Sequence, residues 1–184
     1  MTTQATPTFA TRQELYRWRI AKKGKAVINM CAHMAVMATL AGFGTQALAN
    51  PTGGVVTAGS ATITSAGNLL QINQASNRAI IEWGGFDIAA GETTQFIQPN
   101  AGSLALNRVV NSTQASIING NLLANGRVLV INPNGVLIGA QGNVDVAGFV
   151  ASSADIDNDN FKNSTGAMAF NKAGALNAVV QNQW

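Results

Sequence analysis

Residues 128–139 read VLVINPNGVLIG, two short apolar runs separated by the turn Asn132-Pro133-Asn134-Gly135. Pro133 presets the φ angle of the first central turn position, Asn132 can bond through its side chain to the nearby backbone, and Gly135 accepts a positive φ. A turn of this kind fits two structures. It can reverse the chain into a hairpin of paired strands, or it can bend the chain from one face of a parallel β-helix to the next.

Short apolar runs separated by turns rich in Gly, Asn, Ser and Thr make up the chain from residue 53 to residue 153. Most runs contain three to six residues and favour Val, Ile, Thr and Phe, which is typical of β-strands. Residues 61–64 and 143–146 alternate between apolar and polar side chains, so one face of these strands should be buried. The sequence therefore predicts an all-β domain.

An antiparallel sandwich or barrel and a parallel β-helix both satisfy this pattern. The runs are shorter than sandwich strands usually are, and the low charge suits stacked Asn, Ser and Thr side chains that bond along a solenoid. Turns also recur every six to nine residues, about one face of a β-helix, at Asn119-Gly120, Asn125-Gly126, Asn134-Gly135 and Gln141-Gly142-Asn143. Because Asn-Gly is equally a hairpin signal, these features favour the β-helix without excluding the antiparallel alternative.

Side chains in a β-helix strand alternate between the core and the surface. The residues expected in the core are Ile63, Leu70, Ile72, Ile80, Leu106, Ile118, Val128, Val130, Val136, Ile138, Val144 and Val146.

Charged residues make up 10% of the 184-residue chain, against roughly 25% in an average domain. Six of the 11 Lys and Arg residues lie between residues 12 and 25. From Asn50 onward, five basic and seven acidic residues leave a net charge of about −2. This part of the chain lacks the basic surface of a nucleic-acid-binding protein, so no nucleic-acid partner is expected.

Residues 1–49 have the three parts of a secretory signal peptide, with an extended basic region. An apolar run of about fifteen residues follows the basic region, and Ala47-Leu48-Ala49 then matches an A-x-A cleavage pattern. We therefore expect cleavage between Ala49 and Asn50, which would leave residues 50–184 as one domain.

Cleavage would remove Cys31 and His33, the only cysteine and the only histidine of the chain. The mature domain would then have no disulfide, no zinc site built from Cys or His, and no Ser-His-Asp triad. It would have to be stabilised by backbone hydrogen bonds and core packing.

Four pieces of sequence follow one another with short gaps: WGGFDIAAGETTQFIQP (83–99), SLALNRV (103–109), SIINGNLLANGRVLVINPNGVLIG (116–139) and VDVAGFVASS (144–153). In this order they resemble the haemagglutination-activity, or two-partner-secretion, domain at the N-terminus of filamentous haemagglutinin and related large adhesins. The resemblance extends more loosely over residues 50–184. That family often has an upstream Asn-Pro-Asn-Leu motif, where this chain has Gln98-Pro99-Asn100-Ala101, a departure that indicates a shorter branch of the family.

The resemblance implies a right-handed parallel β-helix with an N-terminal cap, preceded by a cleaved signal peptide. It implies a secretion-recognition domain rather than an enzyme, with no cofactor. The general secretion machinery would export the chain to the periplasm of a Gram-negative bacterium, where an outer-membrane β-barrel transporter with periplasmic binding domains would recognise it. The domain would nucleate β-helix folding of a secreted or cell-surface adhesin, whose further residues could bind a host-cell surface or glycan and contribute to virulence.

Transporter recognition is placed, on this resemblance, at the Asn132-Pro133-Asn134-Gly135 turn, with Asn107 and Arg108 of the LNRV piece as further candidates. An unfolded chain could present the turn as an extended strand that adds to a sheet of the transporter. The turn is also expected to form a structural corner, and Arg108 is expected to donate hydrogen bonds between coils.

Two other functions fit an exported all-β chain. One is a surface adhesin module that itself binds a glycan or host ligand. The other is a β-helical polysaccharide-active enzyme, which would need matched carboxylates such as Glu82, Asp87 and Glu92. The absence of histidine from the mature chain and the sparse charge argue against the enzyme.

The stretch DIDND at residues 155–159 resembles calcium-binding loops, because alternate residues place oxygen atoms on one side of the chain. An EF-hand loop that began at Asp155 would need glycine and glutamate where this chain has Asn160 and Gly166. The loop is therefore expected to be solvated, and no metal site is expected.

Overall fold

The computed structural model describes residues 50–183. The expected signal peptide and the cleavage pattern at Ala47 and Ala49 lie outside the described residues. The strands are β1 (Val55–Ala58), β2 (Ala61–Ala66), β3 (Leu69–Gln74), β4 (Arg78–Trp83), β5 (Thr93–Ile97), β6 (Leu104–Val109), β7 (Ser116–Ile118), β8 (Asn121–Ile131), β9 (Gly135–Ile138), β10 (Asn143–Ser152), β11 (Asp155–Ile156), β12 (Phe170–Lys172) and β13 (Val179–Asn182), with the short helix α3 (Asn158–Asn163) between β11 and β12.

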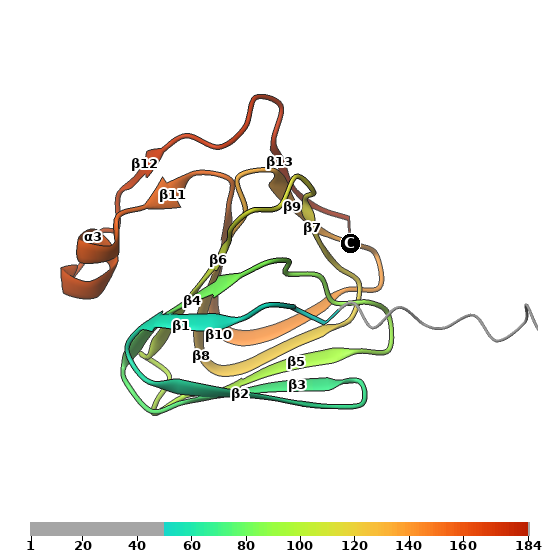
Figure 1. Ribbon diagram of the computed structural model, residues 1–184, viewed down its shortest axis with the longest axis horizontal. Coiled ribbons are helices and arrows are strands. Elements are labelled where there is room, and N and C mark those ends of the chain that lie inside the picture. Colours follow the sequence, from blue (N-terminus) through green and yellow to red (C-terminus); the bar gives the residue numbers. More distant parts are fainter. Residues whose placement is uncertain (1–49, 184) are drawn as a thin grey trace, which may run out of the picture. The chain divides into compact units, whose positions relative to one another are not determined.

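The strands wind into a parallel β-helix of about four turns, seen end-on as a three-sided prism in Figure 1. On the first face β3, β5 and the first halves of β8 and β10 stack in parallel. On the second face β4, β6 and the second halves of β8 and β10 do so, and on the third face β7, β9 and β13 do so. Because β8 and β9 lie on different faces and pair with other coils, the turn between them is a corner, and the predicted β-helix is confirmed.

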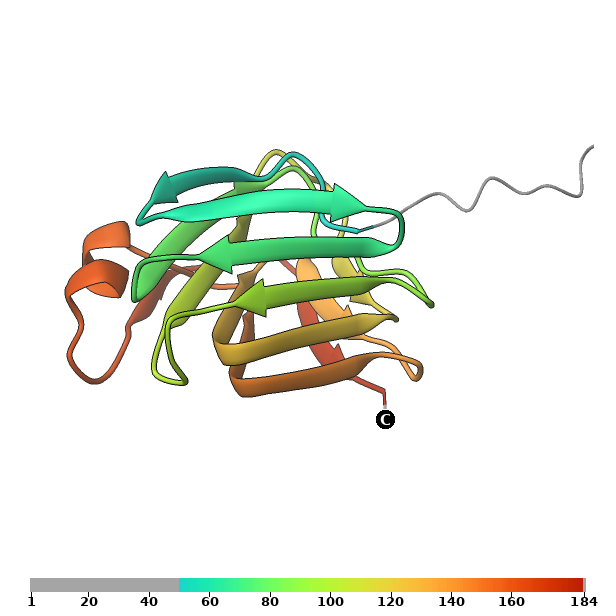
Figure 2. The ribbon, with the colours of Figure 1, turned by 90° about the horizontal axis from the view of Figure 1, so that it is seen from below.

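The N-terminal end of the prism is closed by two strands that run against the direction of the coils. β1 pairs antiparallel with β4, and β2 pairs antiparallel with β3. In Figure 2, β2 lies above the stack of the first face, next to β3, and β1 lies at the same end of the prism. Both strands cover edges of the first coil that would otherwise offer unpaired backbone groups, so the predicted N-terminal cap is confirmed.

Most side chains predicted for the core do lie inside the prism. Leu70, Ile72, Ile118, Val128, Val130 and Val136 belong to the interior cluster, together with Trp83, Phe86 and Phe96, which are each 1% exposed. Ile63, Val144 and Val146 pack half-buried against that cluster, and Ile138 is 8% exposed.

Two of the core predictions, Ile80 and Leu106, are wrong in direction. Both side chains are fully buried, but they belong to a second cluster on the outer side of the second face. Their neighbours Ile81 and Ala105 point into the prism instead. In β6 each alternating set contains two apolar residues and one polar residue, so alternation does not decide which set faces inward. In β4 the polar residues Arg78 and Glu82 flank Ile80 and indicate that its set faces outward.

The second cluster is covered by residues 155–172, which leave the coil after β10 and rejoin it at β13. In Figure 1 this segment, with β11, α3 and β12, lies outside the prism beside the second face. Ile156 and Phe161 of the segment are fully buried against Leu129 and Ile131 of β8. Neither this excursion nor the helix was predicted from the sequence. No helix among residues 50–183 is long and apolar enough to cross a membrane.

Candidate functional site

The Asn-Pro-Asn-Gly corner is a tight turn closed by a backbone hydrogen bond and by the side-chain hydrogen bond expected of Asn132. The Gly135 amide donates to the Asn132 carbonyl at 2.9 Å, which closes the turn. The Asn134 amide donates to the Asn132 Oδ1 atom at 2.9 Å, which is the Asx bond. Gly135 has a φ of 112°, and a Cβ atom placed there would lie 2.5 Å from the Val179 carbonyl oxygen. Only glycine fits this position without a shift of the backbone.

Asn132 joins the corner to the coils on both sides. Its Nδ2 atom donates to the Gln114 carbonyl at 2.9 Å and to the Ser116 hydroxyl at 3.0 Å, both in the preceding coil. Its amide donates to the Ser152 carbonyl in the following coil at 3.1 Å. The side chain is 1% exposed, so in the folded domain Asn132 acts within the structure.

Asn134 and Pro133 form the part of the corner that a partner can reach. Asn134 is half-buried, and its Nδ2 atom donates to the Ser112 carbonyl of the preceding coil at 2.8 Å. Pro133 is exposed, and its carbonyl accepts from the Ala175 amide at 2.8 Å. The accessible surface of the motif in the folded domain is therefore the Pro133 ring and one side of Asn134.

Asn107, the next recognition candidate, lies inside the prism and is fully buried. Its Oδ1 atom accepts from the Trp83 indole at 3.0 Å, and its Nδ2 atom donates to the Leu129 carbonyl at 3.2 Å. These contacts link β6 to the strands before and after it in the stack. The structure thus gives Asn107 an internal role, in register with Val130, two residues before the corner.

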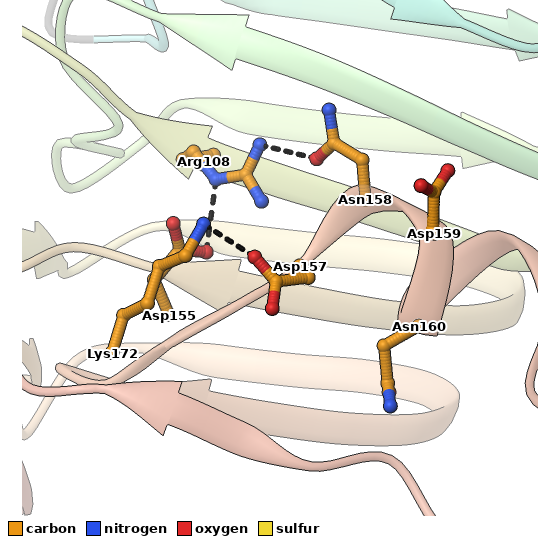
Figure 3. A pocket seen from close by; sticks show the side chains of 7 residues that line it. All are labelled: Arg108, Asp155, Asp157, Asn158, Asp159, Asn160 and Lys172. Atoms are coloured by element: carbon orange, nitrogen blue, oxygen red, sulfur yellow. Dashed lines mark hydrogen bonds and ion pairs between the residues drawn. The ribbon is translucent and has the colours of Figure 1, made fainter.

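Arg108 points to the outer side of the second face and is 9% exposed. Its Nε atom donates to the Asp155 Oδ1 atom at 2.9 Å, and its Nη1 atom donates to the Asn158 Oδ1 atom at 2.9 Å (Figure 3). Its Nη2 atom donates to the Ile156 carbonyl at 2.8 Å. Arg108 was expected to bond between coils. Its three hydrogen bonds instead go to residues 155–158, which lie outside the coils. Glu82 of the preceding coil lies 3.7 Å away.

The acidic stretch predicted to be a solvated loop borders a surface hollow of about 640 Å³ (Figure 3). Each of its carboxylates has a cationic neighbour: Asp155 pairs with Arg108, Asp157 with Lys172 at 2.7 Å, and Asp159 with Lys162 at 2.9 Å. The hydrogen bond from Lys172 holds the pKa of Asp157 below its usual 3.8. Within residues 50–183, no three His, Cys, Asp or Glu side chains are grouped as a metal would require.

The carboxylates considered for an enzyme serve the structure. Asp87 accepts from the Ile117 amide at 2.7 Å, and Glu92 accepts from the Ala89 amide at 2.9 Å. Glu92 is 3% exposed, and Glu82 lies beside Arg108. Each of these three carboxylates thus has a partner within the fold.

The family described as TPS secretion domain matches residues 47–184. Two proteins from Haemophilus influenzae, each named heme/hemopexin-binding protein, are similar: one is 40% identical over 107 residues, 58% of this chain and 12% of that protein, and the other is 42% identical over 88 residues, 48% of this chain and 9% of that protein. The crystal structure of the HMW1 secretion domain from Haemophilus influenzae is also similar, with a TM-score of 0.65 and 39% identity over 72% of this chain and 35% of that chain.

The fold is thus shared with a secretion domain of known structure. The chain belongs to the TPS secretion domain family, and it is a secretion domain of the two-partner type. It spans about a tenth of the curated relatives it matches and about a third of the solved chain.

Proposed function

We propose that residues 50–184 are recognised by the periplasmic domains of one cognate outer-membrane β-barrel transporter, and that the Asn132–Gly135 corner carries this recognition. The proposal rests on the burial of the four corner residues. Asn132 and Gly135 are buried, and they hold the exposed Pro133 and the half-buried Asn134 at the surface. In the unfolded chain the same four residues are an extended segment that can add to a sheet of the partner.

Under this proposal, Asn107 and Arg108 contact the transporter only before the domain folds. Asn107 is fully buried and Arg108 is 9% exposed, so a transporter could read them only in a chain that has not yet formed its coils. Passage through the periplasm after export by the general secretion machinery is part of the proposal, as is a passenger of the adhesin or exoprotein class that acts at a host surface. The binding of heme and hemopexin is named for the two relatives, over most of whose length this chain does not extend.

Secretion of the full chain in cells that contain the transporter tests the recognition role. We expect Asn134→Ile and Asn134→Ala to remain in the periplasmic fraction while the parent chain reaches the medium. The matched control is Asn125→Ala, because Asn125 lies at another corner of the same coil. It also bonds to the preceding coil, through two 2.7 Å hydrogen bonds with the Gln98 backbone.

If the transporter recognises Asn134, the Asn125→Ala variant should be secreted, although it loses comparable hydrogen bonds between coils. Two results would contradict it. One is normal secretion of Asn134→Ile. The other is an equal secretion defect in the Asn134→Ala and Asn125→Ala variants that follows their melting temperatures, which would assign the corner to stability alone.

We propose in addition that the domain nucleates the β-helix of the chain that follows it. β10 pairs with β8 along one edge, and no strand among residues 50–183 pairs with its other edge. Half-buried Val144, Val146 and Phe149 line that end of the core. A further coil stacked there would bond to the open edge and cover these side chains, as neighbouring repeats of a solenoid do.

A further inference from the structure

The outer side of the second face carries a strip of apolar side chains where a β-helix would normally present polar ones. The strip, called here the outer strip, comprises Ile80, Leu104, Leu106, Leu129 and Ile131. Ile80, Leu106 and Leu129 are directly in register across β4, β6 and β8. Each is at most 1% exposed, because residues 155–172, called here the strap, lie over them.

The strap has little stability of its own. Its helix has six residues, which is too short to persist alone in water, and β11 and β12 contain two and three residues. Its fully buried apolar side chains, Ile156 and Phe161, belong to the same cluster as the outer strip. The order of the strap therefore depends on the outer strip, which β4, β6 and β8 of three earlier coils form.

Two arginines on the strands of the outer strip, Arg78 and Arg108, form hydrogen bonds with the strap. Arg108 uses its Nε, Nη1 and Nη2 atoms on Asp155, Asn158 and the Ile156 carbonyl. Arg78, at the start of β4, donates to the carbonyl oxygens of Phe161 and Ser164 at the end of α3. Its guanidinium also lies 5.5 Å from the centre of the Phe161 ring. These bonds are charge-assisted and largely removed from water, which makes them stronger than exposed ion pairs.

The partners of both arginines come much later in the sequence. They are 47 to 50 residues downstream of Arg108 and 83 to 86 residues downstream of Arg78. In contrast, the parallel strands of the coils up to β10 pair over 20 to 28 residues. Among the described parallel strand pairs, only β9 and β13, which lie on either side of the strap in the sequence, pair over a longer separation, 44 residues. Contacts that close longer loops have a larger entropic cost and form later unless other contacts shorten the loop first.

We propose that residues 155–172 are a closing strap that docks after the coils have formed, and that Arg108 is its latch. Before docking, the solenoid exposes the outer strip as an apolar surface; docking covers it and fixes the strap. The strap can open again while the coils stay intact. This inference concerns the folding of the chain itself and does not depend on recognition by a transporter.

Hydrogen exchange of the full chain, resolved by peptide, tests the latch. In Arg108→Leu we expect exchange in residues 155–172 to accelerate roughly 10- to 100-fold, the range for loss of charged hydrogen bonds, while β3, β5 and β8 keep their protection. Asp155→Asn, which removes the charge of one partner, should act in the same direction more weakly. The control is Arg127→Leu, because Arg127 is exposed and its side chain makes no hydrogen bond or ion pair within residues 50–183; its exchange should match the parent.

Pulse-labelled refolding tests the order of events. Amides of β6 and β8 should become protected before amides of the strap, and in Arg108→Leu the later phase should lose amplitude. The proposal is overturned if strap and coil amides become protected together in the parent chain. It is also overturned if both Arg108→Leu and Asp155→Asn leave strap exchange unchanged, or raise exchange equally in strap and coils.

Discussion

At the scale of single residues, the corner at 132–135 depends on contacts that differ in range. The Asx bond within the turn and the positive φ of Gly135 are local, so the identities of four consecutive residues were enough to predict them. Apart from a hydrogen bond from Asn107 to the Ala105 carbonyl, the partners of Asn107 and Arg108 lie 22 to 50 residues away. Neighbouring residues in the sequence do not indicate such distant pairings. Both side chains could therefore be named as candidates, but their bonding partners could not be predicted.

Gly135 is the residue at which the corner should be least tolerant of change. Gly135→Ala should lower the free energy of unfolding by about 3 kcal/mol or more, because its φ of 112° is strained for alanine and the new Cβ would meet the Val179 carbonyl. Gly67→Ala is the control: its φ of 56° is left-handed, but no atom lies within 4 Å of the added Cβ. We expect a loss of about 1–2 kcal/mol there, in urea denaturation. Equal losses at both sites would show that the contact with Val179 does not matter.

At the scale of elements, β6 shows which features of the fold could be predicted from the sequence and which could not. All six of its residues are buried, although Arg108 and Asn107 are among them. A strand apolar on both sides indicates cover on both sides, and the run from Leu104 to Leu106 carried that signal. The covering strap was missed because its residues are mostly polar and only Ile156 and Phe161 are fully buried. Its acidic residues were instead considered for calcium.

The strap should also show a specific pH response at Asp157. The pKa of this carboxyl is lowered chiefly by its hydrogen bond from Lys172, so its contribution to stability is present above the ordinary pKa of 3.8 and is lost as the pH falls through the lower, folded value. In Lys172→Met we expect an NMR titration of Asp157 to give a higher pKa than in the parent chain. Lys162→Met, which removes the partner of Asp159, should leave the Asp157 titration in place. An unchanged Asp157 pKa in Lys172→Met would refute the assignment.

At the scale of the whole molecule, the two ends of the solenoid differ, and this difference gives the last prediction. The first coil is covered by the antiparallel strands β1 and β2, whereas β10 has an unpaired edge among the described residues. A chain that begins at residue 67 lacks both cap strands. It should expose the edges of β3 and β4 and should associate, because unpaired strand edges pair with other chains.

Sedimentation velocity can compare this shortened chain with one that begins at residue 50, which we expect to be less associated at the same concentration. Thr62→Lys and Thr64→Lys in the longer chain are matched controls, since both side chains are exposed on β2 and their replacement leaves the cap strands paired. If the shortened chain sediments and melts like the longer one, the cap is dispensable and the coils are stable without it. If it associates while the lysine variants do not, the covered edge limits association, and growth of the solenoid is directed to the β10 end.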